Sequence, residues 1–200
     1  LKKLPLRNVA VAALNNDELA VVASAFPSLS PLLSQEGGID VILSRPFFLE
    51  AMLSLASRDA ISKLPATEVE LLKLWWELGG SDRPDFSAAQ HRRNVLLNLA
   101  DRLSLAPSLP IAIRDIAPEQ LEELKSAGVI RDKDVGHSVV FAHDIYEEWA
   151  LCQLLISPQF EILSFFMERK EPDLLIRPMQ LRGAYALETD ASAEEWKKLY

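Results

Sequence analysis

One histidine in this sequence stands where an imidazole can bind an anion. His143 follows the apolar run 138–142 and precedes a segment with helical periodicity that opens with Asp144 and Glu147. The first N–H groups of a helix lie at the positive end of its dipole, which favours a phosphate, and an imidazole there adds a donor. In the alternative interpretation, His143 only bonds a neighbouring helix and Asp144 satisfies the cap. Physical reasoning from these residues alone favours this alternative.

The remaining reactive residue types form no catalytic or metal-binding pattern. His91, His137 and His143 are far apart, and Cys152 is the only cysteine. This excludes an internal disulfide and a cysteine-based zinc site, fits a reducing compartment, and leads us to expect no metal. The sequence contains no GxxxxGK[ST], GxGxxG or GxSxG pattern. We therefore do not expect this chain to be an enzyme by itself.

Composition places the chain among ordinary globular proteins. It has 200 residues, 49% of them hydrophobic, with 21 Lys and Arg against 29 Asp and Glu, giving a formal charge of −8. The acidic balance argues against general nucleic-acid binding. No apolar run approaches the ~20 residues of a membrane span, and we expect a cytoplasmic protein. Because the chain lacks an initial Met and stops inside a helical pattern at 195–200, we expect a piece of a longer protein.

The N-terminal third predicts one strand and then helices. The apolar run Val9–Leu14 predicts a buried strand. Asn16 or Asp17 is expected to cap a helix over 18–25. Pro46 is expected to open a further helix, because its missing N–H costs nothing in the first turn.

The central part predicts a winged helix. Thr67 with Glu70 forms a capping-box pattern, and Gly79-Gly80 is a stop. The apolar face of this first helix is expected to consist of Leu71, Leu74, Trp75 and Leu78. The segments that follow are helix 87–103, extended piece 111–113, a helix from Pro118 to the break at Gly128, strand 129–131, loop 132–137 and strand 138–142.

The last part, 158–200, is predicted to be helical. Three residues are expected to interrupt its helices: Pro172, Pro178 and Gly183. The predicted fold class is mainly α, with a winged-helix domain that carries a small β-wing, followed by further helices.

The histidine segment resembles a motif of a known family. Phe141-Ala142-His143-Asp144 followed by Glu147-Glu148-Trp149-Ala150 resembles the end of the winged-helix domain in STAND NTPases, AAA+-related signalling proteins that include NACHT and NOD-like proteins. Their motif is Met-His-Asp, or Phe-x-His in NACHT proteins, and its histidine contacts the phosphates of bound ADP. The resemblance implies that nucleotide-binding role for His143. Ala142 stands where the family often has Met.

A second segment is similar to the helical lid of the same family. Leu43-Ser44-Arg45-Pro46-Phe47-Phe48-Leu49 is similar to the lid's G-x-P-L stretch, whose proline packs on the adenine ring. The resemblance implies a nucleotide-binding role for Pro46, although Ser44 replaces the usual Gly. Pro46 is also explained simply as a helix-starting proline, and the two interpretations are compatible.

The resemblance also implies a domain division and a function. The division is 1–16 as the end of an upstream NTPase sheet and linker, 17–64 as a helical lid bundle, 65–157 as the winged helix, and 158–200 as the start of a helical region. The implied function is the regulatory segment of a nucleotide-switched signalling NTPase. ADP or ATP with Mg²⁺ is expected only together with a P-loop domain before Leu1, the partner in the same chain. Exchange to ATP is expected to favour a self-oligomer.

Two alternatives stay open from the sequence. A DNA-binding winged helix needs a basic recognition helix, whereas the expected one, 118–127, carries Glu119, Glu122 and Glu123. The basic run His91-Arg92-Arg93 is expected to be a solvated helix turn or a contact for an acidic partner. The other alternative is a ligand-free interaction module. The adjacent residues Trp75-Trp76 bear on it, and we expect both to be buried between two subdomains.

Overall fold

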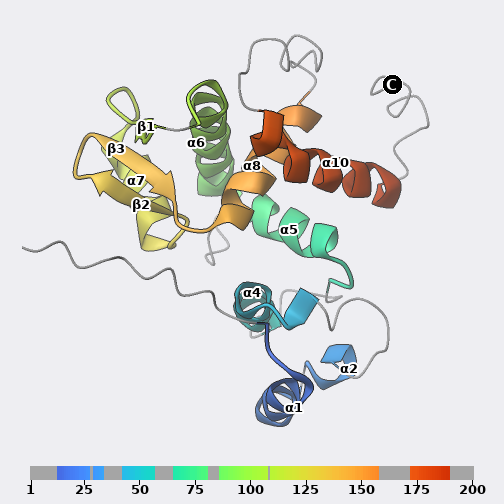
Figure 1. Ribbon diagram of the computed structural model, residues 1–200. Coiled ribbons are helices and arrows are strands. Elements are labelled where there is room, and N and C mark those ends of the chain that lie inside the picture. Colours follow the sequence, from blue (N-terminus) through green and yellow to red (C-terminus); the bar gives the residue numbers. More distant parts are fainter. Residues whose placement is uncertain are drawn as a thin grey trace, which may run out of the picture. The chain divides into compact units, whose positions relative to one another are not determined.

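The computed structural model describes residues 13–27, 29–33, 42–56, 65–80, 86–107, 109–157 and 172–189. These residues are mainly helical and include one small three-stranded antiparallel sheet (Figure 1), which confirms the predicted fold class. The chain divides into two compact units, Leu1–Leu71 and Leu72–Tyr200. Each unit is described by itself below.

The first unit opens with a capped helix. Helix α1 spans Asn16–Ala25, and the side chain of Asn15 accepts hydrogen bonds from the N–H groups of Asp17 and Glu18. The Glu18 carboxylate accepts from the Asn15 N–H at 2.8 Å, which completes a capping box. The prediction that Asn16 or Asp17 caps this helix is therefore wrong by one or two residues. The Asn15 side chain satisfies the N–H groups of Asp17 and Glu18, and the Glu18 side chain satisfies the N–H of Asn15.

Two further helices lie in this unit before α5. Helix α2 spans Ser30–Leu33 and α4 spans Pro46–Ala56, so α4 starts at the expected proline. The core residues of this unit share almost complete burial: Leu29, Leu43, Phe48, Leu49 and Met52. Most of the strand predicted at Val9–Leu14 lies outside the described residues. Its last two, 13 and 14, are not in a strand.

Helix α5 spans Glu68–Glu77, and the boundary between the units falls within it. The Thr67 hydroxyl accepts from the Glu70 N–H at 3.1 Å, as a capping box requires. The Glu70 carboxylate, however, accepts from the N–H of Ala66 at 2.7 Å. The apolar face predicted for helix α5 is only partly correct. Among the four predicted positions only Leu71 is buried, and the other buried side chains are Val69, Leu72 and Trp76.

Helix α5 ends at the predicted double glycine. Gly79 and Gly80 have φ of +67° and +71°, and their N–H groups bond the carbonyl oxygens of Trp76 and Trp75. These bonds satisfy carbonyl groups that the last turn of a helix leaves unpaired. The chain then continues, beyond residues that are not described, to α6.

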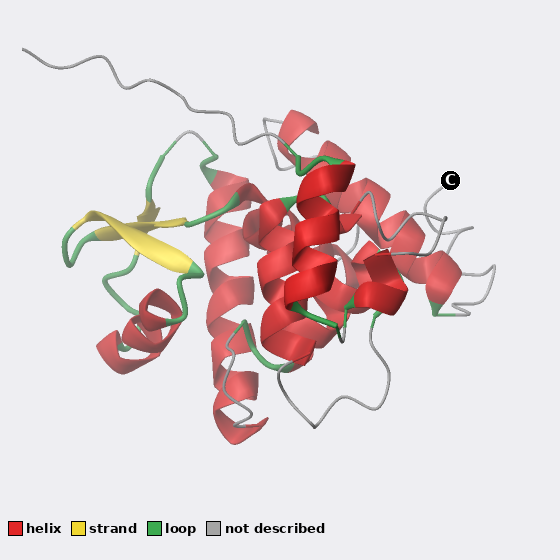
Figure 2. Ribbon diagram, turned by 90° about the horizontal axis from the view of Figure 1, so that it is seen from below, coloured by secondary structure: helices red, strands yellow, loops and turns green. Residues whose placement is uncertain are grey.

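The second unit contains a winged-helix arrangement. Helix α6 spans Phe86–Leu105 and α7 spans Pro118–Ser126, with strand β1 (Ile111–Ala112) between them and β2 (Ile130–Asp134) and β3 (Ser138–Phe141) after them. The sheet order is β1-β3-β2, and both pairings are antiparallel. In Figure 2 the sheet lies at one end of this unit, with α7 beside it. Four large apolar residues of α6 are buried: Val95, Leu96, Leu99 and Leu103.

The wing between β2 and β3 is tighter than predicted. Strand β2 continues to Asp134, so the loop is 135–137 and not 132–137. The pairing shifts between Asp132 and Asp134, which makes Lys133 the extra residue of a bulge. Gly136 in the turn has φ of +74°, a conformation that glycine adopts without strain.

Helix α8 (Asp144–Ile156) is the core of the second unit. It packs against both α6 and α10 (Ile176–Glu188), as Figure 1 shows. Six of its residues are buried: Trp149, Ala150, Leu151, Cys152, Leu154 and Leu155. A helix that is apolar on so many sides is typical of an interior position. Burial raises the pKa of the Cys152 thiol to about 12, so this cysteine is the expected core residue.

The described C-terminal part corrects one prediction. A short 3₁₀ turn, η1 (Pro172–Leu175), leads into α10, and both Pro178 and Gly183 lie inside α10 instead of interrupting it. Pro178 is its third residue, where a missing N–H breaks no helical hydrogen bond. The apolar segment predicted to be helical at 160–167 lies outside the described residues.

Gly79→Ala is expected to destabilise the protein strongly. A Cβ at Gly79 would lie 2.6 Å from the carbonyl oxygen of Ala89, which is backbone of α6 and cannot move cheaply. Strain at positive φ and this clash together are expected to cost about 2–5 kcal/mol in the free energy of unfolding. Urea denaturation measures this. The matched control is Gly136→Ala, which has the same kind of φ but no atom within 4 Å of its Cβ. It is expected to lose only about 1 kcal/mol, and equal losses in the two variants would refute the close contact.

Candidate functional site

The candidate site is built where β3 leads into α8. The N–H of Ala142 donates to the carbonyl oxygen of Val129 at 2.9 Å, which ties the end of the wing to the residue before β2. His143 is the N-cap of α8, with extended backbone (φ −138°, ψ 146°), and its carbonyl oxygen accepts from the N–H of Tyr146. Its side chain is exposed and makes no capping hydrogen bond. The sequence therefore predicted correctly that His143 stands at a helix start.

Asp144 does not cap α8, contrary to the alternative interpretation. It is the first helical residue, and the N-cap position belongs to His143. Asp144 and Glu147 both lie in the first turn, where carboxylates interact favourably with the helix dipole. They also place negative charge at the start of the helix, which matters for any anion that binds there.

An aromatic row runs inward from His143. We define it as His143, Tyr146, Trp75 and Trp76. The imidazole and the Tyr146 ring are arranged edge to face, with 5.7 Å between centroids, and Tyr146 stacks on Trp75 at 4.7 Å with 23° between planes. Trp75 lies 6.2 Å from Trp76, which is buried. Trp75 is only half-buried, so the prediction that both tryptophans are buried is wrong. Adjacent helix positions point in different directions, and only one of them enters the core.

Glu147 is the carboxyl group with the most perturbed titration in the described residues. Burial, and then the charges of Asp144 and Glu148, raise the pKa of Glu147 to about 7. Glu148 lies 3.8 Å from the Arg177 guanidinium of α10, so its charge is partly compensated. At neutral pH, Glu147 is therefore protonated in a large fraction of molecules, and the first turn of α8 carries less negative charge than its sequence suggests.

Pro46, the other predicted site residue, lies in the first unit. It is the first residue of α4 and is exposed, whereas Phe48, Leu49 and Met52 of the same helix are buried. The N–H of Leu14 donates to the carbonyl oxygen of Ser44, two residues before it, at 2.6 Å. His143 belongs to the second unit. Joint contact of Pro46 and His143 with one nucleotide therefore stays a prediction.

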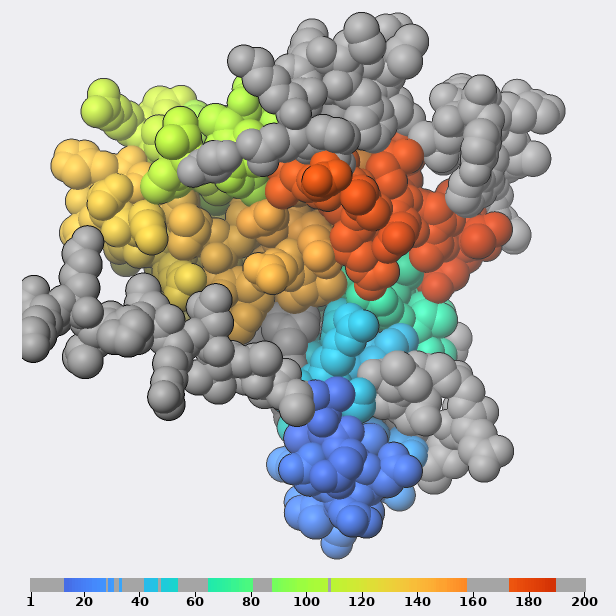
Figure 3. Space-filling view, viewed as in Figure 1, coloured from blue at the N-terminus to red at the C-terminus, as the bar shows by residue number. Residues whose placement is uncertain are grey.

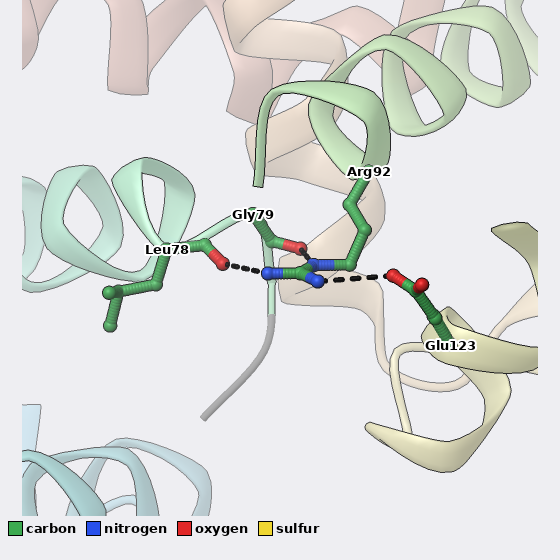
Figure 4. Close-up of polar contacts among 4 residues, drawn as sticks. All are labelled: Leu78, Gly79, Arg92 and Glu123. Atoms are coloured by element: carbon green, nitrogen blue, oxygen red, sulfur yellow. Dashed lines mark hydrogen bonds and ion pairs between the residues drawn. The ribbon is translucent and has the colours of Figure 1, made fainter. Parts of the chain in front are cut away.

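Arg92 belongs to the basic run 91–93, which was expected to be a solvated helix turn or a contact for an acidic partner. It is 4% exposed, not a solvated turn. Its Nε donates to the carbonyl oxygen of Gly79 at 3.1 Å, its Nη2 to that of Leu78 at 3.0 Å, and its Nη1 to Glu123 at 3.1 Å. Figure 4 shows these three contacts converging from the end of α5 and from α7 onto one side chain of α6. A guanidinium suits this place because its planar fork donates in several fixed directions.

The three glutamates of α7 are exposed, but two of them are engaged in ion pairs. Glu123 binds Arg92, and Glu122 lies 2.9 Å from Lys125, which also lies 2.9 Å from Asp132 on β2. These two carboxylates raise the pKa of Lys125. The only lysine of α7 is thus bound to acidic partners of its own chain.

A further arginine attaches the sheet to α6. Arg102 donates through Nη1 to the carbonyl oxygen of Ala112 in β1 at 2.6 Å and forms a two-bond pair with the Asp115 carboxylate. The same pair lowers the pKa of Asp115 and raises that of Arg102. Such bidentate pairs fix geometry as well as adding energy.

The start of α8 is accessible from outside. Figure 3 shows the segment from β2 into α8, coloured yellow to orange, at the surface of this face of the molecule.

Within the described ranges, no group of three or more His, Cys, Asp or Glu side chains is arranged to hold a metal ion. Among the helices that the structure describes, none is long and apolar enough to cross a bilayer. Comparisons with protein-family models, curated proteins and solved structures found no significant match.

Arg92→Lys is expected to lower the free energy of unfolding by about 2 kcal/mol. An ammonium cannot reach both carbonyl oxygens and the Glu123 carboxylate at once, so buried acceptors lose their donor. Urea denaturation measures the loss. The matched control is Arg131→Lys on the exposed face of β2, expected to change stability by less than about 0.5 kcal/mol. If the two variants were equally stable, Arg92 would not hold these elements together.

Glu147→Gln is expected to reduce the pH dependence of stability. The folded pKa of about 7 is above the ordinary value of 4.5, so between these values the folded state binds more protons than the unfolded state. Stability must then fall as the pH rises from about 4.5 to about 7. The glutamine variant lacks this proton, so it should gain stability relative to the wild type as the pH rises. Urea denaturation at about pH 4.5 and about pH 7.5 tests this, and identical pH profiles would contradict it.

Proposed function

We propose that this chain is the regulatory lid and winged-helix part of a nucleotide-switched signalling NTPase of the STAND class. In this proposal, His143 contacts the phosphates of ADP held by a P-loop domain elsewhere in the same protein. The observation that carries the proposal is the placement of His143. Its exposed imidazole is the N-cap residue of α8, directly after the wing, and its side chain is not consumed as a helix cap.

The chemistry of this place suits a phosphate. The N-terminus of a helix provides N–H groups and the positive end of a dipole, and the imidazole adds a donor. The first turn is acidic, which opposes an anion, but the pKa of Glu147 near 7 weakens this opposition at neutral pH. ADP and ATP differ in the number and charge of their phosphates, and His143 is proposed to respond to this difference. Pro46, exposed at the start of α4, is then proposed to pack on the adenine ring.

The proposed switch works by differential contact. A state in which His143 reaches the phosphates is stabilised by ADP, and exchange of the nucleotide releases it and favours a self-oligomer. The bond-breaking chemistry is assigned to the P-loop domain, so this chain is not proposed to be an enzyme by itself. A cytoplasmic location is part of the same proposal.

Winged-helix binding to DNA is less well supported. The helix in the recognition position, α7, exposes Glu119, Glu122 and Glu123, and its Lys125 is paired with Glu122 and Asp132. Carboxylates on this helix would repel DNA phosphates. A ligand-free helical module is the remaining alternative.

His143→Ala in the full-length protein is expected to weaken ADP retention. Loss of one hydrogen bond to a charged phosphate is expected to speed ADP release by about tenfold to a hundredfold. Release of a fluorescent ADP analogue measures the rate, and light scattering measures the fraction of oligomer, which should rise. The control is His137→Ala in the exposed wing turn. Unchanged nucleotide release and oligomeric state in His143→Ala, or the absence of a P-loop sequence from the full-length protein, would refute the proposal.

A further inference from the structure

Three aromatic residues link the exposed His143 to the core of the second unit. His143 lies edge to face with Tyr146, Tyr146 stacks on Trp75, and Trp75 adjoins the buried Trp76. A surface histidine with a free χ1 torsion occupies several rotamers, and binding a phosphate in one of them costs conformational entropy. A ring that already holds the imidazole in one orientation removes part of this cost.

The local geometry explains why Tyr146 can do this. Tyr146 lies in the first turn of α8, three positions after the N-cap His143, and long helical side chains lean toward the N-terminus of their helix. Its ring therefore extends back over the start of α8, where the centroid distance to the imidazole is 5.7 Å. The orientation of 61° between the planes is the edge-to-face arrangement that aromatic rings prefer.

Trp75 in turn fixes Tyr146. The two rings are stacked at 4.7 Å, and Trp75 sits in the last turn of α5. That turn is held in place by the N–H of Gly80, which bonds the Trp75 carbonyl oxygen, and by Arg92, which binds the carbonyl oxygens of Leu78 and Gly79. The end of α5 is therefore a rigid support for the Tyr146 ring.

We infer that Tyr146 and Trp75 are positioning residues that hold the imidazole of His143 in one orientation at the start of α8. The assignment of a phosphate as the ligand rests on the proposed function, whereas the positioning itself does not. An aromatic pair of this kind favours one orientation by about two- to tenfold. The aromatic ring of Tyr146 is what the arrangement requires, and the phenol hydroxyl is not.

The test uses the imidazole resonances of the 200-residue chain without nucleotide. The chain has three histidines, so each can be assigned by single substitution. In the wild type, nuclear Overhauser effects are expected between the imidazole protons of His143 and the ring protons of Tyr146. Tyr146→Leu and Trp75→Leu are expected to shift the His143 resonances toward those of a free histidine, and Tyr146→Phe is expected to retain them. His91 and His137 serve as internal controls and should not shift.

Several outcomes would overturn the inference. One is the absence of any Overhauser effect between His143 and Tyr146 in the wild type, a result that does not depend on the stability of a variant. The others are unchanged His143 resonances in Tyr146→Leu, or an equal shift of all three histidines. The proposed function fails separately, through unchanged ADP release in His143→Ala. If the positioning role and the proposed function are both correct, Tyr146→Leu in the full-length protein should speed ADP release by about two- to tenfold, and Tyr146→Phe should not.

Discussion

The second unit depends on the way in which one buried guanidinium is satisfied. A charged group as buried as Arg92 is costly unless its donors find partners, and here two backbone carbonyls and a carboxylate provide them. The carbonyls of Leu78 and Gly79 belong to the end of α5, which a helix leaves without internal partners. The Arg92 side chain of α6 thus donates to the carbonyl groups at the end of α5 and also binds α7 through Glu123. The close contact between Gly79 and Ala89 is possible only because this end of α5 has no side chain.

This constraint reaches the candidate site through α5. The residues that Arg92 holds follow directly after the turn that carries Trp75, and Trp75 stacks on Tyr146 at the start of α8. Helix α8 itself is fixed along its length by burial, with Trp149 and Cys152 completely covered. The exposed residues at this helix are His143 and Asp144, at its start. A rigid interior helix with one accessible end is a suitable base for a residue that must meet a ligand in a defined position.

The sequence predicted the order of elements in the second unit well because local signals there agree with the global packing. The glycines after α5, Pro118 at the start of α7 and Gly136 in the turn before β3 each act within a few residues. The position of His143 at a helix start followed from the same local signals. Two errors arose where several local signals competed. Asn15 capped α1 because a glutamate completed its box, and Pro178 fitted inside α10 because early helical positions tolerate a missing N–H.

The sequence by itself determined the helices, the wing, and the residue that begins α8, because periodicity, caps and glycines fix the backbone over short distances. Only the tertiary structure decided which of two adjacent tryptophans enters the core, because both have equal propensity and the packing partners come from distant elements. It also decided that Arg92, in a run of basic residues, is buried rather than solvated, since its acceptors lie 13 and 31 positions away in the chain. The contact of His143 with Tyr146 joins residues three positions apart in the chain, whereas the support from Trp75 required α5 and α8 to meet.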